Sequence, residues 1–373
     1  MTSSEGAAVE ARGAHRDVDG CRVLVASGAN ADFFEFLQEM LSSLAEQAGS
    51  SKLSLGCYDL GLSSEQRAWL AERKVQLVAP QTRLRLPSGG DNFWARALLT
   101  RLFLREDFPG YDVYAWFDAD LWFQDLHGVN ALIDTACAHG AAIVHETERG
   151  YRFQDWLFEW TATHFMKGYG LVLGLWLLTR PHLNAGLFAF RADAPHWKRW
   201  RESLQQAIDR TGEVRPYDQF ALNAAIYMHN LPTAFLAPPY NWICDRGIPM
   251  WNEAIGTFCV PYPPYRPISV MHLAGPAKRE IYDVPTINGG SVRASLRHPR
   301  GRRLAAHGGA STGGRISCPA EPAPVASRLP SGGVSSTLQQ NRAKLAALLR
   351  AYRSVYPGRL GLFRKLARYG WRC

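Results

Sequence analysis

The chain has 373 residues, 47% hydrophobic and 20% charged, a composition typical of a globular protein with enough apolar material for one or two cores. Its formal net charge of +9 would ordinarily indicate a nucleic acid or an acidic membrane as a partner. However, residues 285–373 hold 16 of the 42 Lys and Arg side chains and one of the 33 acidic ones, so the body carries −6 and the tail +15. The positive charge therefore belongs to a tail, and we expect no nucleic-acid partner.

Three further classes are excluded by pattern. No apolar run approaches the roughly 18 residues of a membrane-spanning helix. The first 20 residues lack the basic start and apolar stretch of a secretory signal. The seven cysteines form no CxxC pair, which favours reduced thiols over a zinc knuckle or a disulfide framework. We therefore expect a cytoplasmic protein.

Strand and helix patterns alternate along the first third of the chain. After a small, polar segment at 1–20, which predicts a disordered leader, buried strands are predicted at 21–26, 52–58, 75–78 and 112–117. Amphipathic helices are predicted between them at 32–48, 63–72 and 91–103. This alternation predicts an α/β fold with a mixed, mostly parallel central sheet. Ligands of such sheets bind beyond the carboxyl ends of the strands.

The second half has a less regular pattern. Strands are predicted at 139–144, 187–190 and 268–271, and helices at 194–209 and 216–229. The segment 151–181 is rich in aromatic residues, which either pack in the core or stack on sugars. We expect four regions: a leader at 1–20, the main domain at 21–285, a Gly/Ser/Pro/Arg-rich flexible linker at 286–334 and a basic helical tail at 335–373.

The predicted tail combines one apolar face with many cations. Its helix, expected at 335–356, places Leu345, Leu348, Tyr352 and Val355 together, and the last 16 residues add Trp371 and further Arg and Lys side chains. Such a segment suits the surface of an anionic bilayer. The alternative is a helix that packs on the body and leaves its charges in solvent.

Two carboxylates follow the apolar strand at 112–117. Asp118 and Asp120 are two residues apart, so on an extended backbone their side chains lie on the same side and can share one divalent cation. Hard cations such as Mg²⁺ or Mn²⁺ favour oxygen ligands and a substrate diphosphate. The alternative is an exposed turn, since the Asp-x-Asp pattern is common and also occurs at Asp17 and Asp19.

Other polar residues occupy strand and helix ends downstream. Asn184 and Gly186 precede the strand at 187–190. Asp218 is at the start of a predicted helix, and the alternative to a role in the site is that it simply caps this helix. His272 follows the last apolar strand. The glycine turn after it leads to Lys278, an arrangement that can hold a phosphate.

Seven segments in this order resemble glycosyltransferase family 8, which includes glycogenin and bacterial lipopolysaccharide galactosyl- and glucosyltransferases. The resemblance runs through roughly residues 21–282, and its segments are VLVASGAN, FWARALLTRLFL, WFDADLWFQD, LNAGLFAF, YDQFALN, PPYNW and VMHLAGPAK. The resemblance implies the GT-A fold, a Rossmann-like domain that binds a nucleotide sugar.

The resemblance also implies roles for particular residues. Asp118, Asp120 and His272 would bind Mn²⁺ or Mg²⁺, and Asp218, Gln219 and Asn184 would surround the transferred sugar. The remaining positions expected to contact the nucleotide sugar are Ala26, Asn30, Arg96, Gly186, Gly275 and Lys278. Two departures from the family pattern are the lack of an acid at the end of the first strand and Arg279-Glu280 in place of Pro-Trp.

These observations predict a metal-dependent, retaining hexosyltransferase. It would move glucose or galactose from a UDP-sugar to a glycan or glycolipid, in lipopolysaccharide or other cell-surface polysaccharide synthesis. The basic tail would hold it on the inner face of the membrane. Three alternatives remain: an inverting transferase with Asp218 as general base, a non-catalytic module that binds sugar nucleotides or glycans, and a basic scaffold protein.

Overall fold

The computed structural model describes residues 17–18, 21–47, 50–81, 83–88, 90, 93–299, 343–344, 346–352 and 354–355. Its centre is an eight-stranded sheet with the order β4-β3-β2-β5-β8-β7-β9 and β1 beside β2. The strands are β1 (Asp17–Val18), β2 (Cys21–Ala29), β3 (Ser54–Asp59), β4 (Gln76–Val78), β5 (Val113–Phe117), β7 (Ala141–His145), β8 (Leu183–Arg191) and β9 (Ala234–Leu236). The predicted α/β class is confirmed.

Strand direction changes in the middle of this sheet. The β4, β3, β2 and β5 strands run parallel, β8 is antiparallel to both β5 and β7, and β9 is parallel to β7. The sheet is therefore mixed, as expected. One strand differs from its prediction, because Asn184 and Gly186 lie inside β8 rather than in a loop before it.

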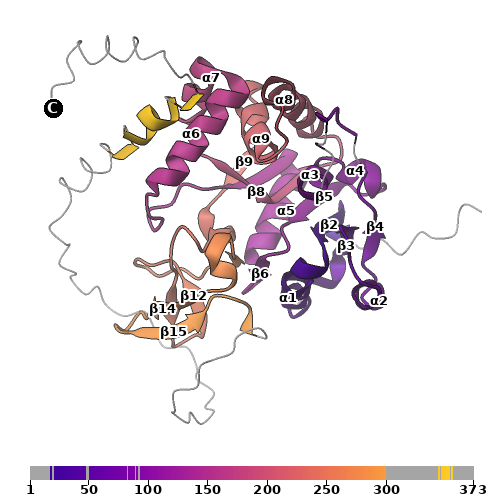
Figure 1. Cartoon of the computed structure of the whole chain (residues 1–373). Helices are drawn as coiled ribbons and strands as arrows, with labels where there is room; N and C mark the ends of the chain where they lie inside the picture. Colours follow the sequence, from indigo (N-terminus) through magenta and orange to yellow (C-terminus); the bar gives the residue numbers. More distant parts are fainter. Residues whose placement is uncertain are drawn as a thin grey trace, which may run out of the picture.

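Helices cover both faces of the sheet, as Figure 1 shows. The alternating side chains of β5 divide the interior into two cores: Tyr114 and Trp116 face one, Val113, Ala115 and Phe117 the other. The first core is closed by α3 (Phe93–Leu99), α4 (Leu104–Asp107), α6 (Asp155–Tyr169), α7 (Leu171–Leu177), α8 (His196–Thr211) and α9 (Tyr217–Met228). The second is closed by α1 (Phe34–Ala45), α2 (Ser64–Glu72) and α5 (His127–His139). Burial on both faces explains the continuous apolar runs of these strands.

A smaller lobe follows the main sheet. Its strands are β6 (Leu121–Phe123), β10 (Trp242–Ile243), β11 (Met250–Asn252), β12 (Thr257–Cys259), β13 (Val270–His272), β14 (Ile281–Pro285) and β15 (Ser291–Ser295), with one 3-10 turn at η5 (Gly275–Lys278). In it, β13 lies between β10 and β6, while β11-β12 and β14-β15 form hairpins. Apart from β6, which lies earlier in the chain, the lobe appears in orange beside the main sheet in Figure 1.

Two predicted boundaries require correction. Asp17 and Val18, placed in the leader, pair with Cys21 and Arg22. The body also continues past residue 285, because β15 lies in the predicted linker and Leu296 is fully buried, its carbonyl accepting a hydrogen bond from the Trp122 indole at 2.9 Å. Residues 291–295 pair with β14, and the side chains of Ala294 and Leu296 are buried. The composition of the segment, typical of a linker, does not predict this burial. The remaining predicted leader residues, 1–16 and 19–20, and the predicted linker residues 300–334 lie outside the described part.

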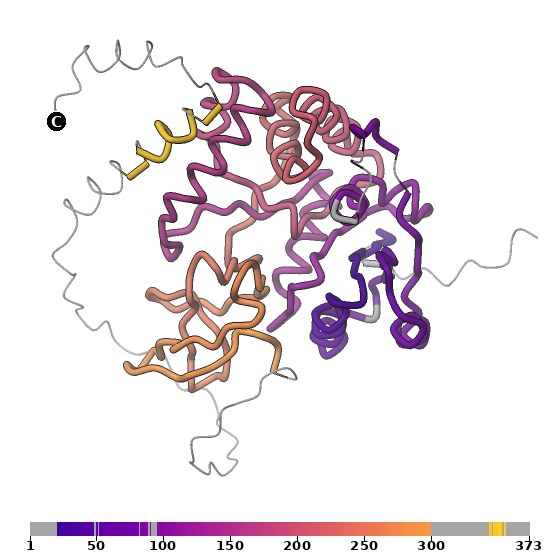
Figure 2. The backbone as a smooth tube through the Cα atoms, viewed as in Figure 1, coloured from indigo at the N-terminus to yellow at the C-terminus, as the bar shows by residue number. Residues whose placement is uncertain are grey.

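The described part of the C-terminal helix packs on the body. Ala351 and Tyr352 are buried against Ala162 and Met166 of α6, and Arg350 pairs with Glu159 and Asp155. In Figure 2 this yellow segment lies beside the magenta α6. The apolar face that was expected to meet a membrane is thus covered by protein at these positions. Within the described residues, no helix is long and apolar enough to cross a membrane.

The extended body boundary predicts a stability effect. Leu296→Ala should lower the free energy of unfolding by about 2–5 kcal/mol, because it leaves a cavity in a closed core. Urea unfolding measures this loss. Arg293→Ala, an exposed position on β15, is the matched control and should change stability little. Equal stability of the two variants would contradict the placement of Leu296 in the folded body and support its assignment to a linker.

Candidate functional site

Strand pairing brings together three potential metal ligands. Asp118 follows β5, Asp120 precedes β6, and His272 ends β13. The antiparallel register of β13 with β6 sets His272 opposite Leu121, beside Asp120. One ligand atom from each of the three side chains lies within 4.8 Å of the others. Asp120 and His272 are buried, which argues against an exposed turn.

Hydrogen bonds fix the orientation of the histidine. Asn184 Oδ1 accepts bonds from the Gly186 amide at 2.9 Å and from Asn241 Nδ2 at 3.0 Å, so the carboxamide oxygen of Asn241 faces His272. That oxygen lies 3.1 Å from His272 Nδ1, which therefore carries the proton and donates. The lone pair is left on Nε2, 3.6 Å from Asp120 Oδ1. Such an outer partner is typical of metal-binding histidines.

Gly186 allows the cluster to close. A Cβ at this position would lie 2.6 Å from Asp118 Oδ2, 2.7 Å from His272 Cε1 and 2.8 Å from Asn184 Oδ1. The Gly186 carbonyl also accepts the Asp118 amide at 2.8 Å. Only a residue without a side chain lets the β8 backbone lie this close to Asp118 and His272.

The expected phosphate loop lies against the same carboxylates. Lys278 Nζ is 2.6 Å from Asp120 Oδ2. Burial alone would raise the pKa of Asp120, but His272 and Lys278 outweigh it and lower the pKa. Gly275 has a φ of +60°, and a side chain there would approach Asp245 at 3.1 Å, so the turn requires glycine.

The guanidinium beside Asp118 belongs to Arg101. Its Nη2 lies 3.3 Å from Asp118 Oδ1, and its Nη1 is 3.7 Å from Asp218 Oδ2 and donates to the Ala185 carbonyl at 2.9 Å. Arg96, the position inferred from sequence, has an exposed side chain. The helix ends at Leu99 and a 3-10 turn over Thr100–Leu102 directs Arg101 inward. In the sequence, the apolar neighbours Leu102 and Phe103 could have indicated that Arg101 is buried.

Asp218 and Gln219 reach the cluster from the first turn of α9. Asp218 is not the helix cap, because Pro216 holds that position. Burial raises the pKa of Asp218 to about 6, and Arg101 opposes the rise. Gln219 Oε1 accepts the Ala185 amide at 3.1 Å, and its Nε2 lies 3.2 Å from Glu146 Oε1 and 2.9 Å from His182 Nε2. The Gln219 and Asn184 amides are thus engaged by protein partners.

Glu146 is a buried carboxylate that the sequence interpretation passed over. It accepts Asn184 Nδ2 at 2.7 Å and pairs with Arg246 at 3.1 Å. Burial alone would raise the pKa of Glu146, but Arg246, His182 and the Asn184 amide outweigh it and lower the pKa to about 2. Its place directly after β7 was the signal, since site residues collect beyond strand ends.

Two other expected nucleotide contacts have structural roles. Ala26 is fully buried in the middle of β2, paired with Gly56 on one side and Trp116 on the other. Asn30 caps the next turn, accepting the Phe33 amide through Oδ1 at 3.0 Å. The side chain of Ala26 has no exposed surface to offer a ligand, and this expectation is corrected.

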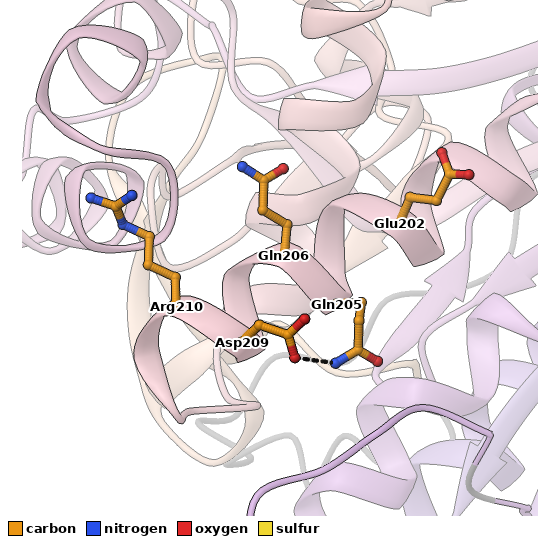
Figure 3. A pocket seen from close by; sticks show the side chains of 5 residues that line it. All are labelled: Glu202, Gln205, Gln206, Asp209 and Arg210. Atoms are coloured by element: carbon orange, nitrogen blue, oxygen red, sulfur yellow. Dashed lines mark hydrogen bonds between the residues drawn. The ribbon is translucent and has the colours of Figure 1, made fainter.

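A shallow pocket lies elsewhere, on the exposed face of α8. Figure 3 shows its lining, in which Gln205 donates to Asp209, and the members are Glu202, Gln205, Gln206, Asp209 and Arg210. The opposite, buried face of α8 supports the site instead, because the Trp200 indole donates to the Asp218 carbonyl at 2.7 Å.

The donor set fits a divalent cation. Two carboxylates and one imidazole nitrogen converge, and a glycine keeps the space between Asp118 and His272 free of a side chain. Among the described residues of the cluster, four carboxylates (Asp118, Asp120, Glu146, Asp218) face three cations (Arg101, Arg246, Lys278). An added cation would offset the remaining negative charge, while Lys278 and Arg101 can hold an anion.

Comparison with known proteins returned solved structures only. No family model and no curated protein matches the chain. It is similar to the galactosyltransferase LgtC in complex with donor and acceptor sugar analogs, at 14% identity and a TM-score of 0.43, over 68% of this chain and 88% of that one. An active-site mutant of LgtC gives 13% and 0.41 over the same shares.

A third solved structure is the bifunctional glycosyltransferase WbbM in its apo form. It matches at 14% identity and a TM-score of 0.42, over 70% of this chain and 47% of that one. All three are glycosyltransferases, the class that the sequence motifs resemble.

The position of Gly186 predicts a metal-binding phenotype. Gly186→Ala should weaken Mn²⁺ binding by at least about tenfold, because the added methyl displaces the Asp118 carboxylate or the His272 ring. Isothermal titration with MnCl₂ measures the affinity. The melting temperature without metal separates this effect from misfolding. Unchanged Mn²⁺ affinity in a folded variant would contradict the assignment.

Proposed function

We propose that this protein is a metal-dependent, retaining hexosyltransferase of the GT-A type, similar to glycosyltransferase family 8. It moves glucose or galactose from a UDP-sugar to a glycan or glycolipid acceptor in cell-surface polysaccharide or lipopolysaccharide synthesis. The observation that carries the proposal is the convergence of Asp118, Asp120 and His272 within 4.8 Å, with Lys278 against Asp120.

The residues of the cluster suit a leaving diphosphate. A Mn²⁺ or Mg²⁺ ion held by Asp118, Asp120 and His272 would supply Lewis-acid stabilisation of the charge on that group. Lys278 adds a cation from its turn, and Arg101 adds a planar fork of donors. As the bond between sugar and phosphate breaks, these fixed charges stabilise the developing negative charge better than they stabilise the bound donor.

The sugar side of the site centres on Asp218. Its carboxyl is buried opposite Arg101 and can accept hydroxyl hydrogens of the transferred sugar. Asn184 and Gln219 act as positioning residues, because their amides bind the backbone of β8 and Glu146. The acceptor hydroxyl then attacks on the face that the diphosphate leaves.

One observation favours a second candidate. Burial raises the pKa of Asp218 to about 6, close to the value that suits a general base at neutral pH. An inverting transferase would use Asp218 in that role. The anomeric configuration of the product, read by proton NMR, distinguishes the two: retention supports the proposal and inversion supports the alternative.

We propose that the basic C-terminal tail holds the protein at a membrane. Residues 356–373 lie outside the described part of the chain, so their binding to an anionic membrane at the inner leaflet stays a prediction. It is based on their cationic and aromatic sequence.

The metal site predicts a metal-dependent activity. Hydrolysis of a UDP-sugar should require Mn²⁺ or Mg²⁺, and Asp120→Asn should lower its rate by at least about a hundredfold, because a charged ligand is lost. Release of UDP, with and without EDTA, measures this. Asp283→Asn, an exposed carboxylate on β14, is the matched control. Metal-independent turnover, or an unaffected Asp120 variant, would refute the proposal.

The placement of Arg101 predicts unequal effects of two similar substitutions. Arg101→Lys should lower kcat/KM for the donor by about tenfold or more, because one ammonium cannot replace a fork that contacts Asp118, Asp218 and Ala185. Arg96→Lys, at an exposed position of α3, should have a small effect. Initial rates at several donor concentrations test the pair. A larger effect at position 96 would restore the sequence-based assignment.

A further inference from the structure

Two exposed tryptophans lie on one face of α6, in the aromatic-rich segment that the catalytic cluster does not use. Trp156 is 58% exposed and Trp160 is 38% exposed. Residues four apart on a helix are neighbours, so the two indoles line the same stripe. Neighbouring exposed indoles are typical of a surface that binds a ligand, because they offer a large flat area at small entropic cost.

This stripe leads into the catalytic cluster. The Trp160 ring packs against His164 at 4.7 Å and against Phe220 at 5.1 Å between ring centroids. Phe220 follows Gln219, the residue that binds Ala185 and Glu146 inside the cluster. The inner end of the stripe therefore packs on α9, the helix that also carries Gln219.

The other end lies near the phosphate loop. Gln154, directly before α6, donates to the Asp245 carbonyl at 3.3 Å. Asp245 in turn adjoins Gly275, where an added side chain would approach it at 3.1 Å. Trp156 is thus two residues from Gln154, whose contact with Asp245 links the start of α6 to the loop that carries Lys278.

The described C-terminal helix occupies a different face of α6. Arg350 pairs with Asp155 and Glu159, while Ala351 and Tyr352 cover Ala162 and Met166. This contact leaves the indoles of Trp156 and Trp160 exposed.

The charged residues on and beside α6 indicate which class of molecule could bind to Trp156 and Trp160. Asp155 and Glu159 are the acids of α6 and both pair with Arg350, while Lys167 is its lysine and Lys344 lies over the neighbouring Phe153 ring. The described charges beside the two indoles are therefore mostly paired and do not form the basic cluster that an anionic bilayer attracts. A neutral ligand with flat apolar faces and polar edges fits better. Pyranose rings have this character, with C–H groups on their faces and hydroxyls at their edges.

We propose that Trp156 and Trp160 form a platform for a sugar ring of the acceptor saccharide, extending from the catalytic cluster. This inference rests on the proposed glycosyltransferase function. The indoles would cover the C–H face of a ring beyond the attacked residue and so select acceptors with at least two sugar units. The chemical class of acceptor is therefore an oligosaccharide rather than a monosaccharide or a bare lipid.

The test compares transfer with hydrolysis. Full-length wild type, Trp156→Ala and Trp160→Phe are assayed with UDP-sugar, Mn²⁺ and a panel of gluco- and galacto-disaccharides and longer oligosaccharides. We expect Trp156→Ala to raise the acceptor KM by about tenfold, as loss of a central aromatic contact does, and Trp160→Phe to raise it less. Hydrolysis of the UDP-sugar by water should be unchanged. Val172→Ala, on the neighbouring α7 at 83% exposure, is the matched surface control.

Three results would overturn the platform. One is an unchanged acceptor KM in Trp156→Ala. Another is donor hydrolysis by wild type without transfer to any oligosaccharide of the panel. The third is loss of binding to vesicles of equal parts phosphatidylglycerol and phosphatidylcholine in Trp156→Ala but not in the Val172→Ala control, with the acceptor KM unaltered. This result would assign the stripe to a membrane.

A binding measurement separates this inference from the proposed function. If wild type hydrolyses no UDP-sugar, the transferase proposal fails. The same oligosaccharides are then titrated against the tryptophan fluorescence of wild type and Trp156→Ala. A saturable change that the variant loses supports a saccharide platform on α6, and the same response in both proteins overturns it.

Discussion

Repulsion between the carboxylates of Asp118 and Asp120 is the constraint on which the surrounding structure depends. Two like charges at a partly closed strand end are costly unless positive groups or a cation stand beside them. The chain supplies Arg101 at Asp118 and Lys278 at Asp120, and the pairing of β13 with β6 adds His272. The antiparallel register of β6 with β13 sets His272 beside Asp120, the residue directly before β6.

Successive layers of amides hold this cluster in one arrangement. Asn241 directs His272, Asn184 directs Asn241, and Glu146 receives Asn184. Each of these contacts joins segments far apart in sequence, so the cluster is as rigid as the sheet beneath it. Buried networks of this kind are stable only when every member is satisfied. The ion pair of Glu146 with Arg246 completes the chain at its outer end.

The sequence predicted most of the secondary structure of the main sheet and two of the residues at its centre with a physical reason. Apolar runs at strand length, broken by helical periodicity, identify a two-sided sheet because both faces are buried. Asp118 and Asp120 were visible because paired carboxylates after a buried strand need a cation. Arg101 and Glu146 were missed because burial of a charged side chain depends on partners 17 and 38 residues or more away, which no local pattern reports.

By itself, the sequence determined the α/β class, the division between an acidic body and a basic tail, and the carboxylate pair, since composition and period fix these locally. Only the tertiary structure decided which side chains meet. It placed Arg101 rather than Arg96 at the carboxylates, continued the body through Leu296, and laid the apolar face of the C-terminal helix on α6. These outcomes depend on strand register and helix packing. A shift of one residue turns a side chain to the opposite face of a strand and about 100° around a helix, and no local pattern fixes either.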